Sequence, residues 1–423
     1  MIRAAIIAAV LAFPSPRMTH GRIGGERMTA PRAGVVRIGS PALFSLSASG
    51  GSLAYSGQTS ATFDRDTAAY RKTGSGLELV AIDTPRVEPA GLLIEDGRTN
   101  YVIRNDDLTT GWTLNSCTID DDSTTDPLGT TTADGVIGAA SGGAHYPSQA
   151  MTTATGLHTV SCFATPGEES WTALQVTNSP NTAQYFNAST CTVGSTTIGS
   201  PTNATAEAIG SMCRVSFSAT FTNASQNLNV LPGEGDGDVV YTGDGSTVDV
   251  SYWGCQISAG AFPGSPLLTA GASATMDDDD AFFGIPETDF ANGGQITVTF
   301  TVPDADGHGV LSVLTIDDET DACNERAYLS IAADGDLTFI TDSAAGTDCL
   351  VETTSEDYSD GTEHTAVVTW GTNTCTLTVD DTLKDTDSTV SPPDDLDMIR
   401  VGDSCGDGSE LEGNIKSIEV LKL

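Results

Sequence analysis

Basic side chains are scarce in this sequence. Its 423 residues contain 18 lysines and arginines against 57 aspartates and glutamates, a net charge of −39. A surface this acidic repels phosphate groups, so nucleic acids and anionic membranes are excluded as partners of the body of the chain. The charge is uneven, because residues 1–104 carry twelve basic and eight acidic residues, whereas the remainder carries six and 49.

The sequence also lacks the apolar spacing of amphipathic helices. No segment sustains apolar residues at i, i+3, i+4 and i+7, which excludes long helices. The longest apolar run, Ala4–Phe13, is too short to cross a bilayer as a helix. Instead, alternating segments such as 158–164, 213–221 and 248–257 are separated by turns rich in Gly, Ser, Thr and Asn. These patterns predict an all-β fold.

Cysteine pairs at metal-ligand spacing are absent. The nine cysteines include no C-x-x-C pair and no neighbouring histidine, which argues against a zinc site. Cys162 and Cys255 lie in strand patterns, where we expect them to be free thiols that act as small buried hydrophobes. If the protein works outside cells, the four late cysteines can form two disulfides in three connectivities. These four are Cys323, Cys349, Cys375 and Cys405.

The patterns divide the chain into four parts. We expect an extended arm at 1–40, a β region at 41–104, and two tandem β-sandwiches at 105–280 and 281–423. Four consecutive aspartates, 277–280, predict a solvated linker between the sandwiches. The arm carries Arg17, Arg22, Arg27, Arg32 and Arg37 at five-residue intervals, which suits an extended segment. A secretory signal peptide, or a start at Met18 or Met28, stays open for this part of the chain.

Four segments in the same order resemble a module of tailed-phage virion proteins, the head-spike or head-fibre domain proteins. The segments are SATFDRDTAAYR (60–71), TPRVEPAGLLIEDGRTNYVIRNDDLTTGW (84–112), DPLGTTTADG (126–135) and YWGCQISAGAFPGSPLLTAGASATMDDD (252–279). The matching positions are Pro85, Arg86, Gly91, Glu95, Arg98, Asn100, Trp253, Gly254 and Gln256. Ser258 departs from the family, which usually has a glutamate there. The part from 281 resembles concanavalin A/laminin-G-type sandwiches, and the resemblance implies a jelly roll for 105–280.

The resemblance implies a non-enzymatic virion protein at the particle surface: a head spike, fibre or decoration protein. Its N-terminal region, the arm at 1–40 together with the particle-attachment region at 41–104, would bind other virion proteins, of the capsid or of the portal and tail. Its sandwiches would bind host-surface glycans. A tail-fibre or baseplate adaptor and a secreted bacterial glycan-binding protein are the alternatives. A homotrimer stays open, since such spikes are commonly trimeric but no coiled coil is present.

Few side chains suggest chemistry of their own. Trp112 and Trp171 lie beside polar loops and are candidate platforms for glycan stacking, whereas Trp253 and Trp370 lie within alternating strands and are expected in the core. For Arg98 we expect a structural bond to a nearby carboxylate such as Glu95. No motif of nucleophilic, metal-dependent or phosphate-loop catalysis is present, so we predict no enzyme activity.

Calcium is the one ion that the sequence suggests, and no other cofactor is expected. The acidic segment DDETDACNE (317–325) offers Asp317, Asp318 and Asp321, and Ca²⁺ prefers several oxygen ligands from one flexible loop. The spacing does not fit an EF-hand, so the prediction of a structural calcium is a weak one.

Overall fold

The computed structural model describes residues 42–178, 181–288, 290, 292–303, 310–318, 325–343, 346–388, 390, 392–393, 396–403 and 410–423. These residues form strands, turns and loops, which confirms the all-β fold class. No helix in this part of the chain is long and apolar enough to cross a membrane. The expected arm at 1–40 lies outside the described residues.

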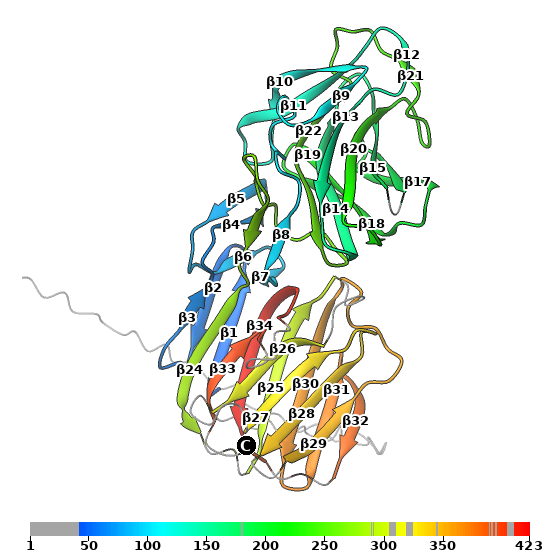
Figure 1. Ribbon diagram of the computed structural model, residues 1–423. Helices are drawn as coiled ribbons and strands as arrows, with labels where there is room; N and C mark the ends of the chain where they lie inside the picture. The colour runs from blue at the N-terminus through cyan, green and yellow to red at the C-terminus, as the bar shows by residue number, and fades with distance from the viewer. Residues whose placement is uncertain are drawn as a thin grey trace, which may run out of the picture. The chain divides into compact units, whose positions relative to one another are not determined.

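The first sandwich consists of two six-stranded sheets (Figure 1). One sheet has the order β10 (Cys117–Thr125), β11 (Thr131–Gly138), β22 (Val250–Ala259), β14 (Gly156–Pro166), β19 (Met212–Phe221) and β18 (Thr202–Ile209). The other has the order β17 (Thr192–Ile198), β16 (Thr182–Asn187), β15 (Trp171–Thr177), β20 (Ser225–Gly233), β13 (Tyr146–Thr152) and β9 (Thr113–Asn115). Apolar side chains of both sheets, including Val160, Phe217 and Leu174, form one core.

The second sandwich also consists of two sheets. The larger has the order β2 (Ser52–Ser56), β1 (Phe44–Ser49), β34 (Gly413–Lys422), β25 (Gly294–Thr301), β30 (Glu363–Gly371), β31 (Thr374–Val379) and β32 (Thr382–Asp387). In addition, β7 (Gly91–Ile94) pairs with β34, and β6 (Arg86–Glu88) pairs with β7. The other has the order β29 (Gly346–Glu352), β28 (Leu337–Ser343), β27 (Arg326–Ile331), β26 (Leu311–Asp317), β33 (Leu396–Val401), β24 (Asp280–Thr288) and β3 (Thr62–Asp64). Every second residue of β25 is buried, as an alternating sequence requires.

The N-terminal strands belong to this second sandwich. β1 pairs antiparallel with β34, β3 pairs with β24, and β7 pairs with β34 (Figure 1). Phe44, Leu46 and Ala48 alternate toward the shared core, so they fill it from the edge of the sheet. Most strands of residues 41–94 therefore belong to the second sandwich, whose last strand, β34, lies more than 300 residues later in the chain.

The first sandwich is thus an insertion within the second. The chain leaves the second sandwich after β7 and re-enters it at β24. Between these points β8 (Arg98–Asn100) pairs antiparallel with β23 (Ala274–Met276), so the outgoing and returning strands run side by side. A hairpin of β4 (Ala69–Thr73) and β5 (Gly76–Val80) precedes β6 in the chain and lies beside this connection (Figure 1).

Three disulfides are present in the described residues. Cys162 is bonded to Cys255, Cys191 to Cys213, and Cys349 to Cys375. The prediction that Cys162 and Cys255 are free thiols was therefore wrong, because β14 and β22 pair antiparallel and bring the two cysteines opposite each other. Cys323 and Cys405 lie outside the described residues.

Candidate functional site

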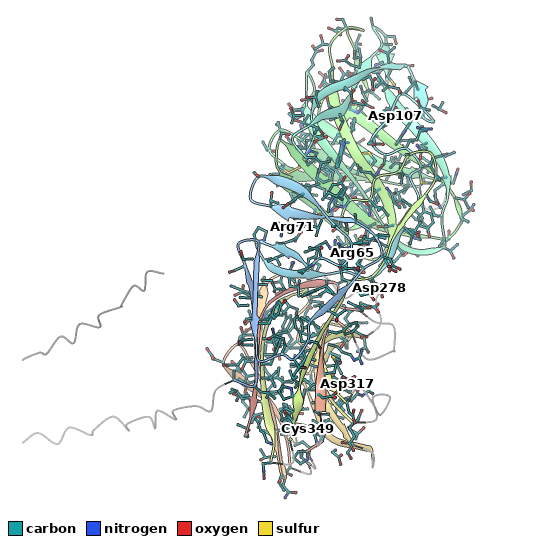
Figure 2. All side chains as sticks on the ribbon, turned by 90° about the vertical axis from the view of Figure 1, so that its left-hand side faces the viewer. Arg65, Arg71, Asp107, Asp278, Asp317 and Cys349 are labelled. Carbon is teal, nitrogen blue, oxygen red and sulfur yellow. A yellow bond between two sulfur atoms is a disulfide. The ribbon has the colours of Figure 1, made fainter. Side chains whose placement is uncertain are left out.

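Buried charges meet where the chain passes between the two sandwiches. Arg86 has no exposed surface; its Nη1 donates to Glu95 Oε2 at 2.5 Å and its Nη2 forms an ion pair with Asp279. Asp279 also binds Arg65 Nη1 at 2.7 Å. Figure 2 shows Arg65 and the neighbouring Asp278 in this region. We call Arg65, Arg86, Glu95 and Asp279 the junction network.

The junction network overturns the expectation that residues 277–280 are only a solvated linker. Asp279 is 6% exposed because two buried arginines require a counter-charge, and β24 begins at the next residue. Burial alone would raise the pKa of Glu95, but the charges of Arg86 and Arg98 and the hydrogen bonds of Ser265 lower it to about 2. The buried carboxylate therefore stays ionised far into the acid range.

Arg98 has the structural role predicted for it, but with a different carboxylate. Its Nη2 lies 2.6 Å from Glu412 Oε2, and both side chains are buried. Glu412 immediately precedes β34, so this ion pair joins the outgoing strand β8 to the second sandwich. A Cβ at Gly264 would lie 2.1 Å from Arg98 Nη1, so only glycine lets the loop approach the guanidinium this closely.

Other residues of the phage-like motif hold the same junction. Asn100 donates from Nδ2 to the Leu267 carbonyl at 2.9 Å, and Gln256 Oε1 accepts from the Leu267 N–H at 3.1 Å. Gly91 has a φ of +147°, and a Cβ there would lie 2.5 Å from the carbonyl oxygen of Ile415. Contacts of both motif segments, near residues 91–100 and at residue 256, therefore determine where the chain leaves the second sandwich and where it re-enters it.

The remaining motif residues lie in or beside these contacts. Pro85 immediately precedes β6, Gly254 has a φ of +60° against the ring of Phe163, and Trp253 is 1% exposed. Trp253 packs edge-on against Phe163, which confirms its core position; Trp370 is fully buried in the second core.

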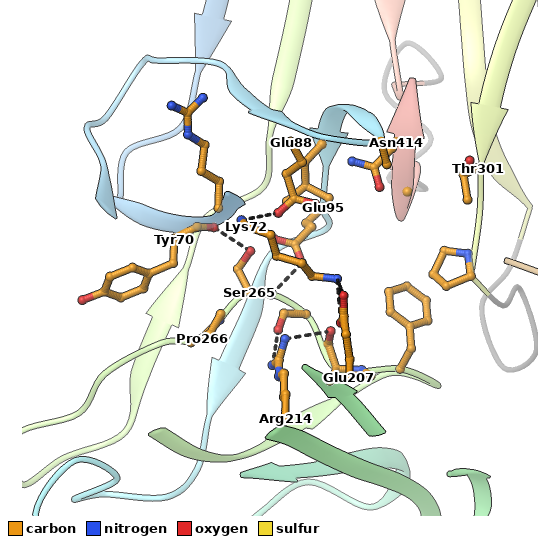
Figure 3. A pocket seen from close by; sticks show the side chains of 18 of the residues that line it. Tyr70, Lys72, Glu88, Glu95, Glu207, Arg214, Ser265, Pro266, Thr301 and Asn414 are labelled. Carbon is orange, nitrogen blue, oxygen red and sulfur yellow. Dashed lines mark hydrogen bonds and ion pairs between the residues drawn. The ribbon is translucent and has the colours of Figure 1, made fainter. Parts of the chain in front are cut away.

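A cavity of about 450 Å³ lies next to the junction network (Figure 3). It is lined by the β4–β5 hairpin, by β18 and β19 of the first sandwich, by residues 262–266, and by residues of the second sandwich such as Thr301 and Asn414. Its size is typical of small-molecule sites, which span roughly 300–1,000 Å³. We call it the junction pocket.

Charges of both signs face the junction pocket. Lys72 Nζ binds Glu207 Oε2 at 2.9 Å, and Glu88 accepts a hydrogen bond from the Lys72 N–H at 2.6 Å. Burial raises the pKa of Glu88 despite that hydrogen bond and the nearby charge of Lys72. Figure 3 shows Arg214 and Glu207 on one side of the pocket and Lys72 reaching toward Glu207 from the other.

Sequence reasoning did not find the junction pocket. Its residues come from six separate parts of the chain, within 70–95, 205–214, 262–266, 301–303, 361 and 413–414. The first and third of these overlap the phage-like segments, but those segments did not indicate a pocket. One signal was available: Arg214 is one of only three arginines beyond residue 104, and it lies within an alternating strand of a strongly acidic region. A single basic residue within a strand of an acidic region is therefore a candidate for a role beyond keeping the protein soluble.

The structure places the two candidate tryptophans differently. Trp112 is 8% exposed within the first core, and its indole N–H donates to the Arg104 carbonyl at 2.8 Å. Its ring therefore offers little face for stacking on a sugar. Trp171 is half-buried on β15 with its ring close to Gly194, and its role in glycan binding stays a prediction.

Of the residues suggested for calcium, Asp317 and Asp318 belong to no group of three close acidic side chains in the described part of the chain. Asp317 is buried in the second sandwich and binds Arg400 Nε at 2.7 Å (Figure 2), and Asp321 lies outside the described residues. Asp318 follows β26 directly and is half-buried. Two other acidic groups come close together, one of Asp121, Asp122 and Asp134 and one of Asp278, Asp280 and Glu410. Acidic proximity alone does not indicate an ion, so calcium stays a prediction.

A histidine in the second sandwich is held between two aspartates. His364 Nδ1 lies 2.8 Å from Asp380 and its Nε2 lies 3.2 Å from Asp360. Although burial lowers the pKa of His364, the hydrogen bonds and charges of both aspartates outweigh it and raise the pKa. Thr362 also lies 3.1 Å from Nε2, but its hydroxyl donates to Asp360 at 2.7 Å. An imidazolium that donates to two carboxylates stabilises structure rather than activating a hydroxyl.

Comparisons with known proteins give no family assignment. No family model and no curated protein matches the chain. Among solved structures, the Ruminococcus gnavus IT-sialidase CBM40 bound to α2,3-sialyllactose is 13% identical with a TM-score of 0.27, covering 34% of this chain and 89% of that one. Mouse laminin α1 domains LG4-5 are 12% identical with a TM-score of 0.26, covering 80% and 93%. At such TM-scores no statement about function follows.

Proposed function

We propose that this chain is a non-catalytic structural protein on the surface of a tailed-phage particle, where its sandwiches bind glycans of the host. One observation carries the proposal. Of the nine positions on which the phage-like resemblance rests, six come together around one buried junction: Arg86, Gly91, Glu95, Arg98, Asn100 and Gln256. Arg86, Glu95, Arg98 and Asn100 thus act together in the fold, which favours a shared module over a chance match of short motifs.

The junction suits a protein that is displayed on a particle. Two neighbouring strands connect the sandwiches. Buried ion pairs hold Arg98, in the outgoing strand, and Asp279, three residues after the returning strand. A double connection of this kind resists bending more than a single linker does, so the first sandwich is held in a defined direction. A head spike, fibre or decoration protein needs this property.

The chemistry of the surface and of the cysteines supports an extracellular setting. Disulfides persist in oxidising surroundings and are rare in the cytosol. Three disulfides and a net charge of −39 fit a surface that is exposed outside cells and repels its own copies. Many copies on one particle would convert weak single sites into useful avidity for host glycans.

Residues 1–40 would anchor the chain to capsid or portal proteins under this proposal. They lie outside the described residues, so the support is their basic character: Arg3, Arg17, Arg22, Arg27, Arg32 and Arg37 oppose a single acid, Glu26. A short basic segment suits contact with an acidic partner surface.

The test asks whether purified particles contain the chain and whether the chain blocks adsorption. Mass spectrometry of particles purified by density should detect peptides of the full chain, including residues 17–40. The full chain with its disulfides intact should compete with particles for host cells, and periodate oxidation of host glycans should abolish the competition. A chain found only in the culture supernatant would refute the virion role and favour a secreted glycan-binding protein.

A further inference from the structure

Arg214 differs from the other buried arginines of the described residues. Arg65, Arg86 and Arg98 each lie within 2.7 Å of a buried carboxylate. Arg214 is 5% exposed and forms no ion pair in the part of the chain that the structure describes. Its guanidinium donates only to neutral oxygens: the carbonyls of residues 263 and 264 and a serine hydroxyl. It therefore carries a buried charge without a bonded counter-charge.

Arg214 remains charged at neutral pH. Burial lowers its pKa to about 10, against weaker attractions from Glu207 and Glu95. A buried charge normally requires a partner, because removing it from water costs several kcal/mol. Arg214 lines the junction pocket, so an anion that enters the pocket can supply the missing partner.

Lys72 offers a second cation on the other side of the pocket. Its bond to Glu207 joins side chains that are 38% and 51% exposed, and an exposed pair of this kind contributes little to stability. Glu207 can therefore be exchanged for another carboxylate at little cost. A ligand carboxylate placed here would interact with Lys72 and Arg214 together.

The rest of the lining fits a small polyhydroxylated ring. Asn414 points its side chain toward the pocket (Figure 3), and its buried Nδ2 donor has no partner among the described residues. Leu77, Phe262 and Pro263 add apolar surface on the same cavity. Sugars present hydroxyl acceptors on their rim and C–H groups on their faces, and both kinds of group have counterparts here.

We propose that the junction pocket binds a sugar that carries a carboxylate. The carboxylate faces Arg214 and Lys72, a ring hydroxyl accepts from Asn414 Nδ2, and the apolar lining contacts the ring face. This inference rests on the proposed function, because it names the class of glycan that the displayed sandwiches would bind.

Calorimetric titration of the full, oxidised chain tests the inference. The probes are methyl β-D-glucuronide and methyl α-D-galacturonide, their neutral glucoside and galactoside counterparts, and acetate. At least one uronide should bind ten times more tightly than its neutral counterpart, and acetate should bind more weakly than that uronide. The variant R214M should remove the preference for the acid, K72M should reduce it severalfold, and R326M, whose arginine pairs with Asp342 outside the pocket, should leave it unchanged.

Each alternative result has a definite meaning. Equal affinity for acidic and neutral sugars, or an equal loss in R214M and R326M, would overturn the inference. Acetate binding as tight as that of the uronides would also overturn it, because the sugar ring would then contribute nothing. If R214M fails to fold, K72M still tests the inference, because Lys72 is partly exposed and its loss should reduce the preference for the acidic sugar. If host polysaccharide binds without preference for the acid, only the ligand class is wrong; if neither sugars nor polysaccharide bind, the proposed function fails as well.

Discussion

Replacing Arg86 by methionine should destabilise the protein strongly, because Glu95 and Asp279 would lose a shared buried counter-charge. The pKa of Glu95 lies at about 2 against an ordinary 4.5, and one pKa unit corresponds to 1.36 kcal/mol, so the ionised state of this one carboxylate contributes about 3 kcal/mol at neutral pH. Removing one partner of a buried pair typically costs about 3–5 kcal/mol. We therefore expect R86M to lower the free energy of unfolding by about that amount.

The assay is urea unfolding of the full, oxidised chain at several pH values, followed by tryptophan fluorescence. Because the pKa of Glu95 is lowered on folding, its contribution is complete above pH 4.5 and is lost as the pH falls toward 2. The difference between wild type and R86M should therefore shrink over that window.

Lys416 provides the matched control. It pairs with Glu363 at 2.6 Å, but both side chains are about half exposed, so K416M should cost less than about 1 kcal/mol at any pH. If R86M and K416M cost the same, or if the R86M difference does not change between pH 4.5 and pH 2, the buried network does not hold the junction and the reasoning above is refuted.

Three further changes test other parts of the structure. H364Q should lower the free energy of unfolding below pH 6.5, where wild-type His364 is charged in both the folded and the unfolded state. The difference between wild type and H364Q should vanish as the pH rises through the raised pKa of the folded state. A difference that does not depend on pH would exclude a charged His364 in the fold. Replacing Cys162 and Cys255 by alanine opens a loop of 93 residues and should lower the free energy of unfolding by about 4 kcal/mol. Thermal unfolding measures this loss, and an unchanged unfolding temperature would contradict the disulfide. G91A should lower the free energy of unfolding by at least about 1 kcal/mol, because its Cβ would meet the backbone of β34. An unchanged free energy of unfolding would show that β7 and β34 can move apart without penalty.

Several features of the fold could be predicted because they are local. Side chains of a strand alternate between its two faces, so the spacing of apolar residues in 158–164 or 213–221 reveals a strand without any knowledge of its neighbours. The core positions of Trp253 and Trp370 followed from the same alternation. The run of four aspartates at 277–280 marked a change in the chain, but the strand β24 that begins at residue 280 was not predicted.

The partners of individual residues were not visible in the sequence. Arg98 was expected to bind Glu95, three positions away, but it binds Glu412, because β34 passes beside the outgoing strand. The aspartate run at 277–280 looked solvated, because nothing nearby in the sequence shows that Arg65 and Arg86 need a buried acid.

The sequence by itself determined an all-β chain of two sandwiches with a strongly acidic body, because composition and two-residue periodicity depend only on neighbouring positions. Only the tertiary structure decided that one sandwich is inserted into the other and that Cys162 meets Cys255. It also decided that Arg214 lies beside a cavity with no ion pair among the described residues. These features arise where segments more than a hundred residues apart, or strands brought together only by pairing, come into contact. The free energy of such contacts depends on geometry that no local pattern contains.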